Sequence, residues 1–251
     1  MASIKKETFG SKDGKEVFVW TLRNNKGNEL KITDLGARVV SMRFRDKDFA
    51  NKFLFKTFKD VGELDNTSGI VLVDGADDFA KIIWQVEQTD EGIKFSAEKD
   101  GKSAAVVYSL SNDNEISIKY ECTGIEDIST KLTFSSEVLP DIDFRSCERV
   151  SQWEKITGEK IYSVTTPAEV MMEIGMFGYD PGCPIDYLNA GLKNAANLFC
   201  EAASIEMIVY ATQNKIHAKE IDGGFAIKTS GSNPADGKIK SQTVYMLKNR
   251  K

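Results

Sequence analysis

Few residues in this chain are suited to acid–base chemistry near neutral pH. Its 251 residues include a single histidine, His217. Histidine is the side chain whose ordinary pKa best suits proton transfer at that pH. One imidazole cannot form a two-histidine site, so a second acid or base would have to be another type of residue. His217 lies in a segment with strand character, where a surface or packing role is the alternative to catalysis.

The cysteines are not spaced as metal binding or dithiol redox chemistry requires. The chain contains four cysteines, and no two of them form a CxxC pair. They are Cys122, Cys147, Cys183 and Cys200. Structural zinc sites and redox dithiols need closely spaced ligands, so we expect no metal and no cofactor. We interpret the cysteines as buried or incidental thiols.

Charge and composition narrow the range of partners. The formal net charge is −5 and the lysines are scattered, so we expect no nucleic acid partner. Hydrophobic residues make up 41% and charged residues 28% of the chain, which is typical of a globular protein. No apolar run resembles a signal peptide or approaches the about 20 residues of a membrane span. We therefore expect no membrane association and a cytoplasmic location.

Short β-branched and apolar runs alternate with clusters of Asp, Asn and Gly along most of the chain. This pattern is typical of a meander of antiparallel strands. Turn clusters recur about every ten residues, as in β-sandwiches. The sequence therefore predicts an all-β fold, with a single domain over residues 1–251. We expect strands at residues 16–22, 29–33, 38–44, 82–86, 93–97, 103–110, 115–120, 129–136 and 160–164.

One segment is ambiguous from its residues alone. Residues 192–203 contain several alanines, which favour a helix. Residues 204–212 are rich in β-branched and apolar side chains, which favour a strand. Propensity alone would therefore place a helix before that strand.

Several motifs occur in the order found in the aldose 1-epimerases, or galactose mutarotases. DGKEV at 13–17 and ITDLGARVVSM at 32–42 resemble the family's opening pattern. YSLSNDNEISIKYE at 108–121 resembles its YTLT.DNEL.I.YE hairpin, and this is the best match in the chain. The remaining matches are DGADDF at 74–79 with Trp84 for HGG..GF….W, KLTFSS at 131–136 for NLTNHS, GYD at 178–180 for GYDH, and residues 192–212 for L..AA….SG..MEV.T.

The resemblance implies the fold of that family, a large super-sandwich of antiparallel strands. It also implies that residues 192–203 form a strand rather than a helix. The chain is shorter than typical members, and the missing piece falls between Asp48 and Gly69. The family carries the sugar-binding arginine of its NRI motif there, so we expect a strand pair and that arginine to be absent.

The chemistry of that family requires two opposed acid–base groups. Mutarotation opens a pyranose ring and closes it on the other face, so one group takes the anomeric proton while another protonates the ring oxygen. Carried over motif by motif, the acid histidine is replaced by Ser135 and the base glutamate by Lys228. A helper histidine is replaced by Val73 or, after a shift of one residue, by Asp74. Asp180 alone keeps the residue type of the family.

Three functions are compatible with these replacements. The resemblance implies an aldose 1-epimerase-like protein with a carbohydrate-binding scaffold and impaired or absent mutarotase activity. One alternative is an active aldose or sugar-phosphate 1-epimerase that uses Lys228 and Asp180, provided that burial lowers the pKa of the lysine. Another alternative is a protein interaction module that binds no sugar.

The candidate ligand is a monosaccharide or a sugar phosphate. Candidate binding residues are Asp180, Lys228, Ser135 and Asp74, although a turn at Asp180-Pro181-Gly182 explains that aspartate equally well. Pyranose faces stack on aromatic rings, so Phe79 and Trp84 are candidates for a sugar platform. Core packing is the alternative for Trp84.

Overall fold

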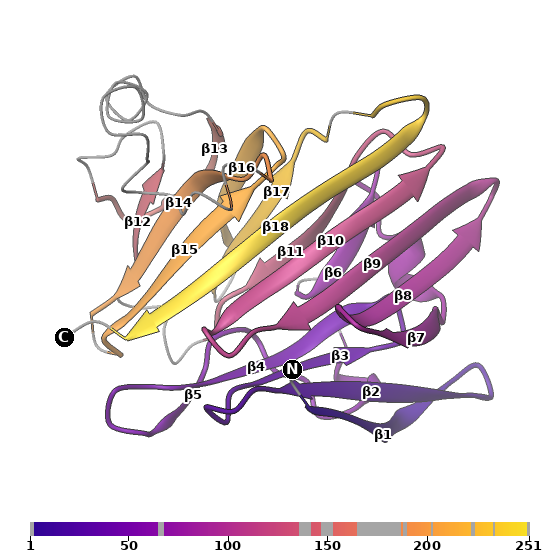
Figure 1. Cartoon of the computed structure of the whole chain (residues 1–251), viewed down its shortest axis with the longest axis horizontal. Coiled ribbons are helices and arrows are strands. Elements are labelled where there is room, and N and C mark those ends of the chain that lie inside the picture. Colours follow the sequence, from indigo (N-terminus) through magenta and orange to yellow (C-terminus); the bar gives the residue numbers. More distant parts are fainter. Residues whose placement is uncertain are drawn as a thin grey trace.

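The molecule is built from β-strands arranged in three sheets (Figure 1). The structure is a computed structural model, and it describes residues 3–64, 68–135, 142–146, 153–164, 187, 190–201, 203–221, 224–232 and 234–249. Two short 3₁₀ turns, η1 (Val61–Glu63) and η2 (Asp78–Lys81), lie between strands. Neighbouring strands of each sheet pair antiparallel, which confirms the predicted all-β fold class.

The N-terminal sheet is a meander in which each strand pairs with the next along the chain. It confirms the strands that were expected at residues 16–22, 29–33 and 38–44. In the region expected to be shortened, a short strand still pairs with the end of β4. The strands are β1 (Ser3–Lys12), β2 (Lys15–Arg23), β3 (Glu29–Thr33), β4 (Arg38–Arg45) and β5 (Asn51–Phe53).

The large sheet has the order β12-β14-β15-β18-β10-β9-β8-β7. Strand β18 lies between β10 and β15, so the last strand of the chain joins the middle hairpins to the C-terminal hairpin (Figure 1). Alternate residues of β9 and β10 are buried, as the sequence pattern predicts. The strands are β7 (Gln85–Thr89), β8 (Gly92–Lys99), β9 (Lys102–Leu110), β10 (Glu115–Thr123), β12 (Ile142–Ser146), β14 (Lys193–Cys200), β15 (Ile205–Ala211) and β18 (Lys238–Asn249).

The small sheet packs against the large sheet and has the order β13-β16-β17-β11-β6. It therefore brings together strands from three distant parts of the chain. The strands are β6 (Ile70–Val73), β11 (Ile128–Thr133), β13 (Glu159–Ser163), β16 (Lys215–Ile221) and β17 (Gly224–Ser230). Strands β11 and β13 confirm those expected at 129–136 and 160–164, each with shifted ends.

The strand expected at residues 82–86 begins later, at Gln85. The preceding residues form η2, and the backbone N–H of Trp84 donates to the C=O of Asp34 at 2.8 Å. Ile82 and Ile83 thus contact the N-terminal sheet region instead of the large sheet: Ile83 forms an isolated antiparallel bridge with Leu35, and the C=O of Ile82 accepts from the N–H of Gly36 at 2.8 Å. Apolar content alone does not tell whether a short run pairs as a strand in its own sheet or crosses to another sheet.

The alanine-rich segment is strand β14, as the resemblance implied and contrary to helix propensity. Ala195 and Ala196 are fully buried. A bulge between Asn194 and Ala196 shifts the register of β14 against β15. The small side chains therefore serve packing in the middle of a sheet, where tertiary context overrides propensity.

Two buried tyrosine hydroxyls connect the sheets. Tyr108 on β9 donates to the C=O of Ala37 at 2.8 Å, and Tyr120 on β10 donates to Thr130 Oγ1 at 2.8 Å. Both rings belong to one hydrophobic core that includes residues of all three sheets. Burial raises the pKa of both tyrosines, so both hydroxyls stay protonated and can donate. The single domain expected over residues 1–251 stays a prediction.

The Tyr120–Thr130 hydrogen bond provides a test of how the large and small sheets are coupled. We expect Tyr120→Phe to lower the free energy of unfolding by about 1–3 kcal/mol, because it leaves the buried Thr130 hydroxyl without its donor. Combining it with Thr130→Val should cost less than the sum of the two single changes. Urea unfolding followed by circular dichroism measures all three variants, and strict additivity would contradict the coupling.

Candidate functional site

Two positions implied for sugar chemistry, Lys228 and Ser135, are carried by strands of the small sheet. Along β16, Ile216 and Ala218 enter the hydrophobic core. Successive side chains of a strand point to opposite sides, so His217 and its two lysine neighbours in this alternation point away from the core. We call this side the outward face of the small sheet.

A row of three side chains crosses the outward face. Strands β16 and β17 pair His217 with Lys228. Strands β17 and β11 pair Ile227 with Leu132, so one step along this register Lys131 lies next to Lys228. Directly paired residues project to the same side of a sheet. We call His217, Lys228 and Lys131 the His–Lys row.

The imidazole of His217 is half-buried and hydrogen-bonded. Its Nε2 lies 2.6 Å from the Oγ of Ser230. Burial lowers the pKa of His217 below its ordinary value, and the charge of Lys228 lowers it further, against weaker opposition from Glu159 and Asp127. The imidazole is therefore neutral at neutral pH.

Among the described residues, positive charge exceeds negative charge on the outward face. Glu159 pairs with Lys219 at 2.8 Å, and Asp127 accepts two backbone N–H groups beyond β17. Lys228 is half-buried and has no ion pair within 4 Å in the part of the chain that the structure describes. In a chain of net charge −5, such an excess suits an anionic group. The lysines on this face are Lys131, Lys215, Lys219 and Lys228.

Ser135 lies just beyond the end of β11, on the same face, but its hydroxyl is already engaged. Its Oγ donates to the C=O of Phe53 on β5, and its N–H donates to the C=O of Leu54 at 3.0 Å. These bonds connect the end of β11 to the N-terminal sheet. A hydroxyl whose proton is held by a buried carbonyl is poorly placed to protonate a substrate.

Asp74 lies at the opposite end of β11 from Ser135 and closes a turn. Its carboxylate accepts from Lys102 Nζ at 2.7 Å and from two backbone N–H groups, of Glu126 at 2.7 Å and Asp127 at 3.0 Å. Partial burial raises the pKa of Asp74, but these donors outweigh it and hold that pKa below its ordinary value. These contacts give the Asp74 carboxylate a structural role in the turn, with no need for a ligand.

Val73, the other position for the helper histidine, is part of the hydrophobic core. It pairs with Ile128 of β11. Its side chain therefore points away from the outward face, and it cannot contact a ligand there.

The aromatic platform expected at Phe79 and Trp84 is buried. Their side chains are 3% and 2% exposed, and the two rings pack edge to face with centroids 5.8 Å apart. The indole N–H of Trp84 donates to the C=O of Phe79 at 2.8 Å. This corrects the stacking prediction, because neither ring presents a face on which a pyranose could lie. Core packing, the alternative, accounts for both residues.

Asp180 lies outside the described residues, so its place relative to the His–Lys row stays a prediction. The structure places Lys228 next to His217. The sequence analysis did not predict that these two residues are neighbours. The sequence did contain a signal for this pairing, namely the dipeptide Asp222-Gly223 between two strand-like runs. Asp-Gly is typical of a tight hairpin, and counting outward from it pairs residue 217 with residue 228.

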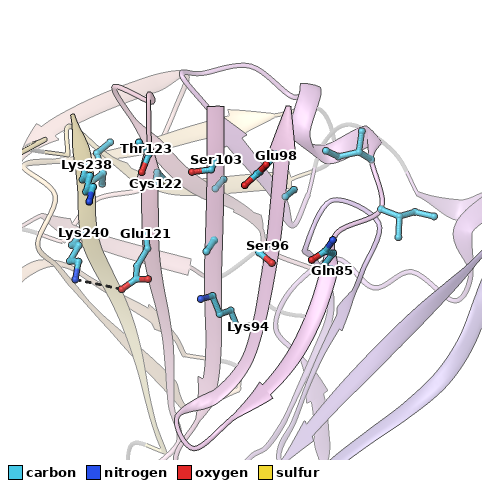
Figure 2. A pocket seen from close by; sticks show the side chains of 16 residues that line it. Gln85, Lys94, Ser96, Glu98, Ser103, Glu121, Cys122, Thr123, Lys238 and Lys240 are labelled. Carbon is cyan, nitrogen blue, oxygen red and sulfur yellow. Dashed lines mark ion pairs between the residues drawn. The ribbon is translucent and has the colours of Figure 1, made fainter. Parts of the chain in front are cut away.

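A separate recess of about 680 Å³ lies on the outward face of the large sheet (Figure 2). Its lining includes Lys94, Glu98, Glu121 and Lys240, and Lys240 pairs with Glu121 at 3.8 Å. With Lys238, its lining has three lysines and two glutamates, and the described lining contains no aromatic side chain. Its charges are therefore nearly balanced and it lacks a stacking surface, so it favours no single ligand class.

Metal ligation and membrane insertion find no support in the described ranges. Among those residues, no three His, Cys, Asp or Glu side chains are grouped so that they could hold a metal ion. Over the same ranges, no helix is both long enough and apolar enough to cross a bilayer. Cys122 and Cys200 are buried, and burial raises the pKa of the Cys122 thiol to about 12.

Comparison with known proteins finds similar structures without similar sequences. No protein-family model matches the chain, and no curated protein sequence matches it significantly. A GalM/aldose epimerase homologue from C. elegans matches with a TM-score of 0.69 and 10% identity over 100% of both chains. Galactose 1-epimerase from Lactobacillus acidophilus matches with a TM-score of 0.64 and 12% identity, also over 100% of both chains. A galactose mutarotase-like protein from Clostridium acetobutylicum matches with a TM-score of 0.56 and 11% identity over 98% of each chain.

These matches show the fold of the chain. It is the galactose mutarotase-like sandwich of antiparallel strands, which confirms the architecture that the sequence resemblance implied. Identities of 10–12% concern the fold alone and do not carry an activity over to this chain.

The pKa of His217 can be measured directly, because it is the only imidazole in the chain. We expect an NMR titration to give a value below 6.5, and Lys228→Met to raise it by removing the neighbouring positive charge. A lowered folded-state pKa means that the unfolded chain binds the proton more tightly. The contribution of His217 to stability therefore falls as the pH drops below about 6.5. A wild-type value above 6.5, unchanged in Lys228→Met, would contradict this description.

Proposed function

We propose that the protein binds a phosphorylated monosaccharide on the outward face of the small sheet, without acting as a mutarotase. The observation that carries the proposal is the His–Lys row, a local excess of positive charge on an acidic chain. Support for a sugar comes from the fold, which is shared with a galactose 1-epimerase. A phosphate is the most common group on a sugar that would select for adjacent lysines.

The row supplies two kinds of contact. Lys228 and Lys131 offer ammonium groups to phosphate oxygens. The hydrogen-bonded pair of His217 and Ser230 offers a neutral imidazole and a hydroxyl, each of which can donate to or accept from a sugar hydroxyl. Asp180, which keeps the family's residue type, is proposed as a further ligand to the sugar.

We infer the lack of mutarotase activity from the contacts of the residues that the sequence resemblance aligns with catalytic positions. The Ser135 hydroxyl donates to a backbone carbonyl. The Asp74 carboxylate accepts from two backbone N–H groups in a turn at the other end of β11. The sequence resemblance aligns Lys228 with the position of the base, and the charge of Lys228 lowers the pKa of the neighbouring imidazole. Losing a general acid or base typically lowers a rate by about 10²–10⁴, and the resemblance implies that both are replaced.

Binding can be tested with glucose 6-phosphate and unphosphorylated glucose as probes. We expect the phosphate ester to bind more tightly and to shift the signals of the single imidazole as it saturates the protein. Lys228→Ala should weaken binding of the phosphate ester about tenfold, because it removes one charge-assisted contact. Isothermal titration calorimetry and the imidazole signals in NMR spectra measure the two effects.

The matched control is Lys94→Ala, which removes a half-buried lysine from the large sheet and should leave the affinity unchanged. Equal losses in the two variants would indicate nonspecific attraction to lysines and would overturn the site. The protein interaction module would be favoured instead if no monosaccharide or sugar phosphate of a panel binds and pull-downs yield a protein partner.

A further inference from the structure

A second polar hollow lies at the end of the molecule where the N-terminal sheet meets the large sheet. Its volume is about 350 Å³, and it is lined by the β2–β3 turn, the β4–β5 hairpin, the β9–β10 turn and the end of β18. Figure 1 shows the β4–β5 hairpin beside the end of β18. The side chains that matter are Asn25, Lys26, Arg45, Asp46, Phe49 and Asn114. We call it the hairpin hollow, and no residue of the His–Lys row lines it.

Phe49 stands on the rim of this hollow in an unusual conformation. Its side chain is 81% exposed, and its φ of 62° lies in the left-handed region that bulky residues avoid. Asp46 maintains the turn, because its Oδ1 accepts from the N–H of Asp48 at 2.9 Å and of Ala50 at 2.8 Å. An exposed apolar ring held at a strained backbone position points to a binding surface.

Arg45 contributes unpaired donors to the same hollow. Its Nε is buried and has no hydrogen-bond partner among the described residues. The guanidinium lies against Gly27, where an added Cβ would be 3.0 Å from the Arg45 Cζ. Asn28 and Asn249 fix the backbone of Arg45 through its N–H and its C=O. The backbone of Arg45 is thus fixed, and among the described residues its side chain has no ion pair within 4 Å.

Asparagine side chains give the hollow a rigid floor. Asn114 Oδ1 accepts from Asn24 Nδ2 at 3.0 Å and from Asn28 Nδ2 at 2.7 Å, which connects the β9–β10 turn to the β2–β3 turn. The N–H of Asn25 donates to Asn112 Oδ1 at 3.1 Å. The side-chain amide of Asn25 is left exposed at the rim. The turns therefore hold their positions whether or not a ligand is present.

The geometry points to a second saccharide site in the hairpin hollow, at which a neutral sugar ring stacks on Phe49 and its hydroxyls bind Arg45 and Asn25. Sugars combine an apolar C–H face with a rim of hydroxyls, which matches an exposed ring beside planar donors. The carboxylate of Asp46 lines the same hollow and offsets one of the two positive charges of Arg45 and Lys26. The exposed ring of Phe49 suits the C–H face of a sugar and offers a phosphate no contact, so an uncharged saccharide is the proposed ligand.

Methyl glycosides provide a selective test, since they carry no phosphate and cannot mutarotate. The probes are methyl α-glucoside, methyl β-galactoside and methyl N-acetyl-β-glucosaminide, observed by saturation-transfer difference NMR. We expect at least one to bind, and Phe49→Ala to weaken that binding about fivefold. Phe49→Trp should retain it, and Gly27→Ala should weaken it by displacing the Arg45 guanidinium.

The control variant is Lys94→Ala on the large sheet, which lies outside the hairpin hollow and should leave methyl glycoside binding unchanged. Binding of glucose 6-phosphate is measured separately in Phe49→Ala, so that this site and the His–Lys row are tested independently. Repeating the titration with maltotriose and chitotriose distinguishes a free sugar from the end of a glycan, because only the latter gains affinity with chain length. Absence of binding by all the glycosides, or binding that survives Phe49→Ala, would overturn the proposal. So would a protein partner lost in Phe49→Ala without any saccharide binding.

Discussion

A tyrosine buried between sheets must find a partner for its hydroxyl, and this requirement determines how the three sheets meet. Tyr108 satisfies it with a carbonyl of the N-terminal sheet region, and Tyr120 satisfies it with Thr130 of the small sheet. An unpaired hydroxyl at either place would cost about 1–3 kcal/mol, which is as much as the burial of one to a few methylene groups gains. The strands that carry both candidate sites are therefore set against the large sheet by a few directional contacts within a largely nondirectional core.

The sequence resemblance aligns Ser135 and Asp74 with catalytic positions, and in the structure both side chains are engaged in structural contacts. The end of β11 is connected to the N-terminal sheet through Ser135, and the turn after β6 is closed by Asp74. A group bound in that way is costly to recruit for proton transfer. The outward face offers charge and hydrogen-bonding capacity where His217 and Lys228 are paired. A shared fold does not fix a function, so the proposed ligand site rests on these residues.

Local patterns in the sequence predicted most strands, because alternation in segments such as β9 and β10 directly reflects burial. They did not predict which distant strands become neighbours, since pairing of β11 with β17 depends on the whole core. Phe79 and Trp84 were candidates for a sugar platform, with core packing as the alternative for Trp84, because composition does not tell which face of a short run is covered. The strained Phe49 also escaped notice, because the left-handed conformation is set by the Asp46 turn rather than by its own residue type.

The most direct test of a binding site without mutarotase activity is the rate at which glucose and glucose 6-phosphate anomers interconvert. Exchange NMR at equilibrium measures this rate with the protein at saturating concentration and in protein-free buffer. The account predicts equal rates, with the ligand bound, because the described residues of the outward face supply no opposed acid and base. A saturable acceleration that is lost in His217→Gln or Lys228→Ala would contradict it and would show that the His–Lys row is catalytic.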